Sequence, residues 1–137
     1  MLITYADCMG NRLGDLRGVL EGCLQGTFGG VHVLPFYPSS GDRGFAPITY
    51  DEVDPKFGSW DDVEKIARNH YFMADFMINH ISKRSSYYKD FQQNKDRSAY
   101  RDFFIRYKNF WPEQEPTQRD ICLLYTSPSP RDQRGSR

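Results

Sequence analysis

The sequence lacks any apolar run near the roughly 18 residues that a transmembrane helix needs, so none is expected. Residues 1–4 show no basic segment followed by an apolar one, and a signal peptide is therefore not predicted. The formal net charge is zero, with 18 basic and 18 acidic residues, which gives no support for nucleic-acid or anionic-membrane binding. These absences favour a cytoplasmic chain without nucleic-acid or membrane partners.

Regular cysteine spacing is also missing. An odd count of three (Cys8, Cys23 and Cys122) argues against a disulfide framework and against a C-x-x-C metal site. At 137 residues the chain suits one ordinary domain, and it is far shorter than the ~250 residues of a complete eightfold β/α barrel. Aromatic residues are plentiful at 15%, which suits carbohydrate or other ring-bearing ligands and equally an ordinary core.

Three short apolar runs, at residues 2–5, 31–35 and 71–78, predict strands. Between the first two runs, apolar residues recur at three- and four-residue steps and predict an amphipathic helix over residues 11–24. Its predicted inner stripe consists of Leu13, Leu16, Val19, Leu20, Cys23 and Leu24. A second helix is expected to begin at Ser59, with Asp62 where a capping box has Glu. Its predicted inward residues are Val63, Ile66 and Ala67.

This alternation of strands and helices predicts an α/β fold with parallel strands and right-handed crossovers. Residues 36–54 are dense in turn formers and predict a long loop, of the kind that is usually functional or disordered. Nearly continuous hydrophobicity in residues 72–78 predicts a strand covered on both faces. Asp75 interrupts that run, so its charge must be paired or lie near a polar cavity.

The run D-F-M-I-N-H at residues 75–80 ends with Asn79 and His80 side by side. An apolar segment that stops at two hydrogen-bonding side chains indicates a strand whose carboxyl end enters a polar site, and parallel α/β sheets have their sites at that edge. Taken alone, His80 is better explained as a core histidine, Asp42 as an ordinary turn residue, and Phe45 as a packing residue. The position of His80 at a strand end beside Asn79 favours the site interpretation.

Several longer strings resemble one family. They are M-L-I-T-Y-A-D at the start, G-G-V-H-V-L-P-F-Y-P-S-S-G-D-R-G-F-A-P-I at 29–48, I-T-Y-D-E-V-D-P-K-F-G-S-W-D-D-V at 48–63, the D-x-x-x-N-H pattern at 75–80 and F-W-P-E-Q-E-P-T-Q at 110–118. In this order they resemble the α-amylase family (glycoside hydrolase family 13), in particular the sucrose phosphorylases and their near relatives. The resemblance covers residues 1–121.

The resemblance implies an α/β fold made of the first three β/α units of a (β/α)8 barrel. Residues 1–82 would belong to the barrel, and residues 83–121 would begin an inserted B subdomain. The implied activity is phosphorolysis of sucrose to α-glucose 1-phosphate and fructose with retention, which uses two carboxyl groups about 5–5.5 Å apart. These carboxylates are expected beyond the end of this chain. No catalytic residue is therefore assigned, and the truncated chain is expected to be inactive.

The family's binding residues can be transferred only where the motifs match. His80 would correspond to the histidine that hydrogen-bonds the glucosyl 6-hydroxyl, Asp42 to an acid that binds glucosyl hydroxyls, and Phe45 to the aromatic wall against the sugar ring. Asp75 and Asn79 would be structural residues near the site. The resemblance implies sucrose and inorganic phosphate as ligands, no metal or organic cofactor, and it allows a homodimer of the parent enzyme.

Alternatives remain open within and outside the family. A related phosphorylase could use sucrose 6′-phosphate, glucosylglycerate or glucosylglycerol, and an α-glucosidase-type hydrolase belongs to the same superfamily. A non-enzyme alternative is a small α/β sugar-binding module. A doubly wound module would need a glycine-rich phosphate loop after the first strand, for which residues 7–11 are a poor match.

Residues 122–137 form a separate tail. The string C-L-L-Y-T-S-P-S-P-R-D and the residues after it have no apolar periodicity. They resemble an in-frame translation of a sequencing adaptor, so we expect a non-native tail and exclude it from fold prediction. Arg131 lies in this tail and is not taken for the phosphate-contacting arginine of the family.

Overall fold

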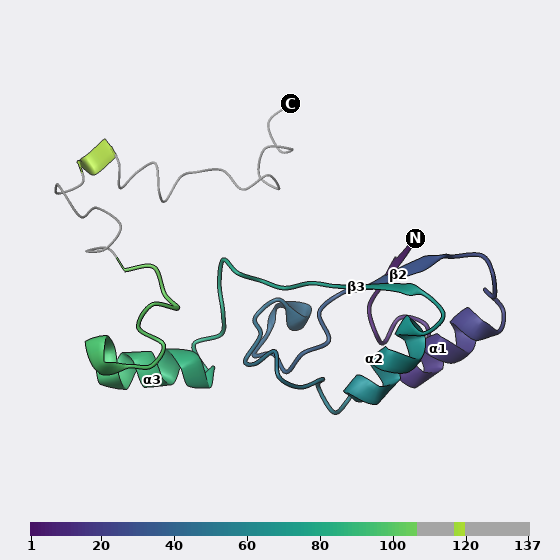
Figure 1. The fold of residues 1–137 in the computed structure, drawn as a ribbon, viewed down its shortest axis with the longest axis horizontal. Helices are drawn as coiled ribbons and strands as arrows, with labels where there is room; N and C mark the ends of the chain where they lie inside the picture. Colours follow the sequence, from purple (N-terminus) through teal and green to yellow (C-terminus); the bar gives the residue numbers. More distant parts are fainter. Residues whose placement is uncertain (107–116, 120–137) are drawn as a thin grey trace. The chain divides into compact units, whose positions relative to one another are not determined.

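The computed structural model describes residues 1–106 and 117–119. The described residues form a strand–helix alternation, as the sequence predicts (Figure 1). The elements are β1 (Leu2–Thr4), α1 (Leu13–Glu21), β2 (Gly30–Val33), the 3-10 turn η1 (Asp42–Gly44), α2 (Trp60–Ala67), β3 (Tyr71–Ala74), α3 (Ser86–Asn94) and η2 (Lys95–Arg97).

The three strands form one sheet in the order β1-β2-β3, and both pairs are parallel. Because side chains alternate along a strand, each row of paired residues faces one side of the sheet. The row that contains Val31 faces the helices, and Val31 is fully buried. The row of Ile3, His32 and Met73 faces the other side, where Ile3 is 61% and Met73 47% exposed.

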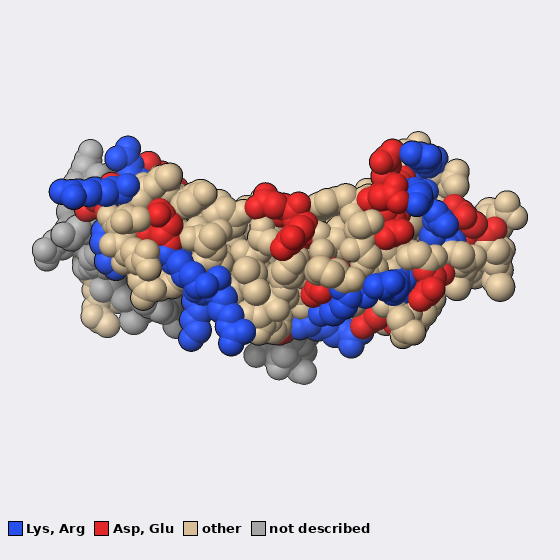
Figure 2. Space-filling view, turned by 90° about the horizontal axis from the view of Figure 1, so that it is seen from below, with Lys and Arg blue, Asp and Glu red and all other residues tan. Residues whose placement is uncertain are grey.

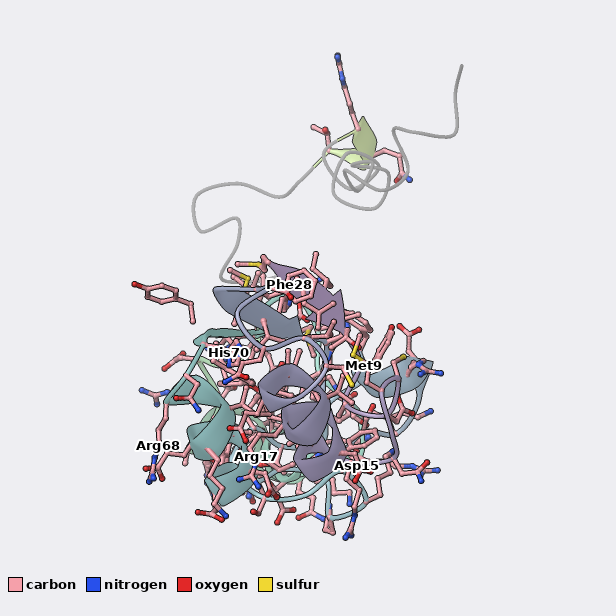
Figure 3. All side chains as sticks on the ribbon, turned by 90° about the vertical axis from the view of Figure 1, so that its right-hand side faces the viewer. Met9, Asp15, Arg17, Phe28, Arg68 and His70 are labelled. Carbon is pink, nitrogen blue, oxygen red and sulfur yellow. The ribbon has the colours of Figure 1, made fainter. Side chains whose placement is uncertain are left out.

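This exposure corrects one prediction. Within the described residues, β3 is covered on one face and not on both, because α1 and α2 lie on the same side of the strands. Figure 3 shows the two helices side by side there, with Arg68 directed away from the helix pair. The opposite face and the outer edges of β1 and β3 have no partner among residues 1–106 and 117–119.

Leucines of α1 fill the core between helix and sheet. Leu13, Leu16 and Leu20 are at most 1% exposed, which confirms these three members of the predicted stripe, whereas Val19 and Leu24 are half-buried. The predicted range of 11–24 is too long, since α1 ends at Glu21 and is followed by Gly22 at its C-cap. Cys23 therefore lies outside the helix and is exposed; glycine disfavours helix continuation because it loses more backbone entropy than other residues.

The start of α2 is set by the predicted local signal. The backbone N–H of Ser59 donates to Asp62 Oδ2 at 3.0 Å, as the third helical residue does in a capping box. Val63 and Ile66 are buried as predicted. Ala67 is exposed, contrary to the prediction, because it lies about 100° around the helix from Ile66.

The third strand is shorter than predicted. β3 ends at Ala74, although the sequence stays apolar through Ile78. Ala74 pairs with Val33, the last residue of β2. Two residues after Val33, Pro35 has no N–H to donate to a strand ladder. The hydrophobicity of residues 75–78 alone therefore cannot extend β3.

The chain divides into two compact units, residues 1–101 and 102–137. In the first unit, Ser85 caps α3 by accepting a hydrogen bond from the N–H of Tyr88 at 3.2 Å. In the second, Arg106 Nη2 lies 3.6 Å from Asp102 Oδ1. The predicted B-subdomain start at residues 83–121 spans both units and stays a prediction. The predicted non-native tail, residues 122–137, lies outside the described residues.

Charges of both signs are mixed on the surface. On the face seen in Figure 2, Lys and Arg side chains are interspersed with Asp and Glu. In residues 1–106 and 117–119, no helix combines the length and the apolar character that crossing a membrane requires.

Candidate functional site

The segments that leave the carboxyl ends of the strands meet at one edge of the sheet. There the stretch after β3 is tied to the loop between β2 and α2. His80 Nε2 lies 2.6 Å from the backbone oxygen of Phe45. A carbonyl oxygen only accepts, so Nε2 carries the proton, and in a neutral imidazole Nδ1 is then an acceptor. Two of the three predicted sugar-binding residues are therefore in contact, through the side chain of His80 and the backbone of Phe45.

Asp42 and Phe45 belong to the same tight turn. The N–H of Phe45 donates to the backbone oxygen of Asp42 at 2.9 Å, while the Asp42 side chain is exposed. Asp42 and Arg43 both have a positive φ, 52° and 48°, and Gly44 follows with a φ of 100°. A Cβ at Gly44 would lie 2.5 Å from the backbone oxygen of Pro35, so only glycine fits there.

Arg43 holds this turn against the end of β1. Its Nη2 lies 3.0 Å from Asp7 Oδ1, and its guanidinium lies 4.3 Å from the centre of the Tyr5 ring. The side chain is 58% exposed, so the interaction is a surface ion pair combined with a cation–π contact. Left-handed backbone costs a non-glycine residue roughly 1–2 kcal/mol, and these contacts offset part of that cost.

A cavity of about 440 Å³ opens beside this turn. It is lined by aromatic rings and by charged and polar groups: Tyr5, Asp7, Asn11, Tyr37, Arg43, Gly44, Lys56 and Phe57. The apolar faces of a sugar can stack on such rings while its hydroxyls bond to the polar groups. The lining does not include Asp42, Phe45 or His80, so the structure does not place these three residues around this cavity.

Asp75 has the partner that its position in an apolar segment requires. Its Oδ2 lies 3.1 Å from His32 Nε2, on the sheet face away from the helices. His32 is thus a hydrogen-bonding partner of Asp75. The Asn79 side chain is exposed and makes no hydrogen bond within residues 1–106 and 117–119, so its structural role stays a prediction.

Two tyrosines that the sequence did not single out complete this edge. Tyr37 is 7% exposed, and its ring packs 4.7 Å from Phe36 and 5.0 Å from Tyr50. Burial, followed by the charges of Tyr50 and Asp75, raises the pKa of Tyr37. The Tyr50 hydroxyl donates to the Met77 carbonyl at 2.8 Å and accepts from the Met77 N–H at 3.1 Å. Burial raises the pKa of Tyr50, while the bond to the Met77 backbone opposes that rise.

No group of three metal-ligating side chains is brought together in the part of the chain that the structure describes.

Comparison with known proteins assigns the chain to a family. The alpha-amylase catalytic domain matches residues 3–123. The chain is 54% identical to a sucrose phosphorylase of Streptococcus mutans over 125 residues, 91% of this chain and 26% of the relative. It is 44% identical to a glucosylglycerol phosphorylase of Marinobacter adhaerens over 109 residues, 80% of this chain and 23% of the relative.

A solved structure gives the same result. The crystal structure of sucrose 6F-phosphate phosphorylase from Thermoanaerobacter thermosaccharolyticum superposes with a TM-score of 0.76 at 50% identity, covering 88% of this chain and 24% of that one. The chain spans about a quarter of the length of the curated relatives that it matches.

Proposed function

Because this chain belongs to the α-amylase family, whose catalytic domain is a (β/α)8 barrel, we propose that it is part of a retaining sucrose phosphorylase. Its three parallel strands fit the fold as a partial barrel. The observation that supports the site is the contact between His80 and the turn of Asp42 and Phe45, at the carboxyl edge where barrel enzymes have their active sites.

In this proposal the chain supplies one side of a glucosyl pocket. With Nε2 donating to Phe45, His80 offers Nδ1 as an acceptor for the 6-hydroxyl of the sugar. The Asp42 carboxylate accepts from hydroxyls on another edge of the ring, and the Phe45 ring covers an apolar face. The nucleophile and the acid/base belong to the part of the longer protein outside this sequence, so no step of bond cleavage is assigned to these residues.

Donor identity is the open part of the proposal. Sucrose, sucrose 6′-phosphate, glucosylglycerate and glucosylglycerol share the glucosyl group and differ in the group that leaves. Residues proposed to bind the glucosyl group do not discriminate among these donors. We favour sucrose, with inorganic phosphate as acceptor, because the identity is 54% to the Streptococcus mutans sucrose phosphorylase and 44% to the glucosylglycerol phosphorylase; the 50% identity to the sucrose 6F-phosphate phosphorylase makes sucrose 6′-phosphate the first alternative. A cytoplasmic location and a homodimer of the parent enzyme are further predictions, and hydrolysis is the alternative activity.

The test uses the full-length protein encoded by the source DNA. Incubation with sucrose and phosphate should release α-glucose 1-phosphate, and the same reaction without phosphate should release little glucose. Parallel reactions with the three alternative donors identify the leaving group. His80→Ala should lower kcat/KM for every glucosyl donor. Release of glucose alone in the presence of phosphate would replace the proposal with a hydrolase, and no turnover of any donor would refute it.

A further inference from the structure

We propose that Tyr50 is a positioning residue that acts through His80, an inference that depends on the function proposed above. Backbone pairing between β2 and β3 stops at Val33 and Ala74. After that point the segment towards His80 has no strand partner among the residues that the structure describes. The Tyr50 hydroxyl takes over this role, since it bonds to both the N–H and the carbonyl of Met77. One side-chain oxygen thereby satisfies the two backbone groups that a ladder would otherwise pair.

Tyr50 is itself held in place. Its ring packs 5.0 Å from Tyr37 at 74° and 4.5 Å from Phe76. Tyr37 belongs to the buried core, so the packing connects the Tyr50 hydroxyl to a rigid part of the fold. The hydroxyl keeps its proton at neutral pH, because burial raises the pKa of Tyr50 above its ordinary value.

His80 lies between two anchors that come from the same loop. Tyr50 fixes Met77 before it, and the backbone oxygen of Pro47 accepts from the Ser82 N–H at 2.9 Å after it. Ile78, between Met77 and His80, is 88% exposed, so packing does not fix this stretch. Without the Tyr50 hydroxyl, His80 keeps its downstream anchor and its bond to Phe45 but loses its upstream anchor. The imidazole should then be less well placed for the 6-hydroxyl.

The experiment compares two donors within each variant of the full-length enzyme. The probes are α-glucose 1-phosphate and its 6-deoxy analogue, used as glucosyl donors in the synthetic direction with fructose. Tyr50→Phe removes one oxygen atom and keeps the ring. We expect its kcat/KM to fall about ten-fold for α-glucose 1-phosphate, and to stay within about two-fold for the 6-deoxy donor, whose missing hydroxyl cannot meet His80. Taking the ratio within one variant cancels any difference in the amount of folded enzyme.

A second arm uses His80→Ala. In that background the added Tyr50→Phe change should have little further effect, because the two residues act in series. Tyr87→Phe is the matched control: it removes a hydrogen bond of 2.8 Å to Asp51, next to Tyr50 in the chain, without touching Met77. The control should show the same ratio between donors as the unmodified enzyme.

The outcomes separate this inference from the function that it depends on. Equal losses for both donors, or equal losses with and without His80, would mean that Tyr50 is merely structural and would overturn the inference. An unchanged Tyr50→Phe enzyme would overturn it as well. If the unmodified enzyme transfers no glucosyl group from α-glucose 1-phosphate or from any other donor, the proposed function fails first.

Discussion

The left-handed turn at Asp42 and Arg43 allows a sharp test of what holds the candidate site together. Replacing Arg43 by alanine removes the ion pair to Asp7 and the contact with the Tyr5 ring, while the φ of 48° stays costly for a residue with a Cβ. Replacing it by glycine removes the same contacts and also the backbone cost. The two variants therefore differ in the strain at this residue and in the larger backbone entropy that glycine loses on folding, and a matched pair at a helical position measures the second term.

The magnitudes follow from the contacts. An exposed ion pair contributes ~0.2–1 kcal/mol and an exposed cation–π contact ~0.5–1 kcal/mol. Arg43→Ala should therefore lower the free energy of unfolding by about 1–2 kcal/mol. Arg43→Gly should recover roughly 1 kcal/mol of this loss, because glycine adopts a positive φ without strain. Glycine would then be more stable than alanine at this position, the reverse of the usual order.

The assay is equilibrium unfolding of the full-length protein in urea, followed by tryptophan fluorescence. Arg68 provides the matched pair, since it also forms a surface ion pair, to Glu64 at 2.9 Å, but its φ of −65° and ψ of −32° are helical. At Arg68 the glycine variant should be less stable than the alanine variant by about 0.5–1 kcal/mol. If glycine were the less stable replacement at Arg43 too, the argument from strain would be refuted.

Three further predictions concern the sheet and its edge. Ile3→Ala should lower the free energy of unfolding by about 2–4 kcal/mol in the full-length barrel, where the uncovered sheet face becomes interior. In the 137-residue chain, where Ile3 is 61% exposed, the loss should be less than about 1 kcal/mol. Equal losses in urea unfolding would contradict this assignment of the face. The 137-residue chain alone should melt without a sharp transition, because one sheet face and both edges are bare among the described residues, and a cooperative calorimetric peak would disprove this. Burial raises the pKa of Tyr37 and of Tyr50, so the folded state holds these protons more tightly than the unfolded chain does. This contribution to stability is complete below about pH 10 and is lost as the pH rises further; the Tm of Tyr50→Phe should fall less steeply than that of the unmodified protein between about pH 9 and pH 11.

The sequence predicted those parts of the fold that depend on near neighbours. The cap at Ser59 needs only Asp62, three residues away, and the leucine spacing of α1 needs only the helical repeat. The predicted end of β3 was wrong because the strand ends where its partner β2 ends. The hydrophobicity of residues 75–78 carries no information about that partner. For the same reason the contact between Tyr50 and Met77, separated by 27 residues, had no local signal.

The candidate site was predicted from resemblance more than from physics. Asp42 and Phe45 belong to common residue types, and only their positions in the motifs singled them out, whereas His80 also lies at the end of an apolar run. The structure adds that the His80 imidazole meets the Phe45 backbone. The assigned roles towards a sugar stay predictions, as do those of Asp75 and Asn79. Arg43 is a structural contact of the turn through its ion pair with Asp7.

The bond from His80 to Phe45 ends on a main-chain oxygen and not on the aromatic ring. Every amino acid presents that oxygen, so the orientation of the imidazole does not depend on which side chain occupies position 45. Under the proposed function, libraries that vary residue 45 should therefore leave the orientation of the histidine unchanged, and the two residues can be varied independently.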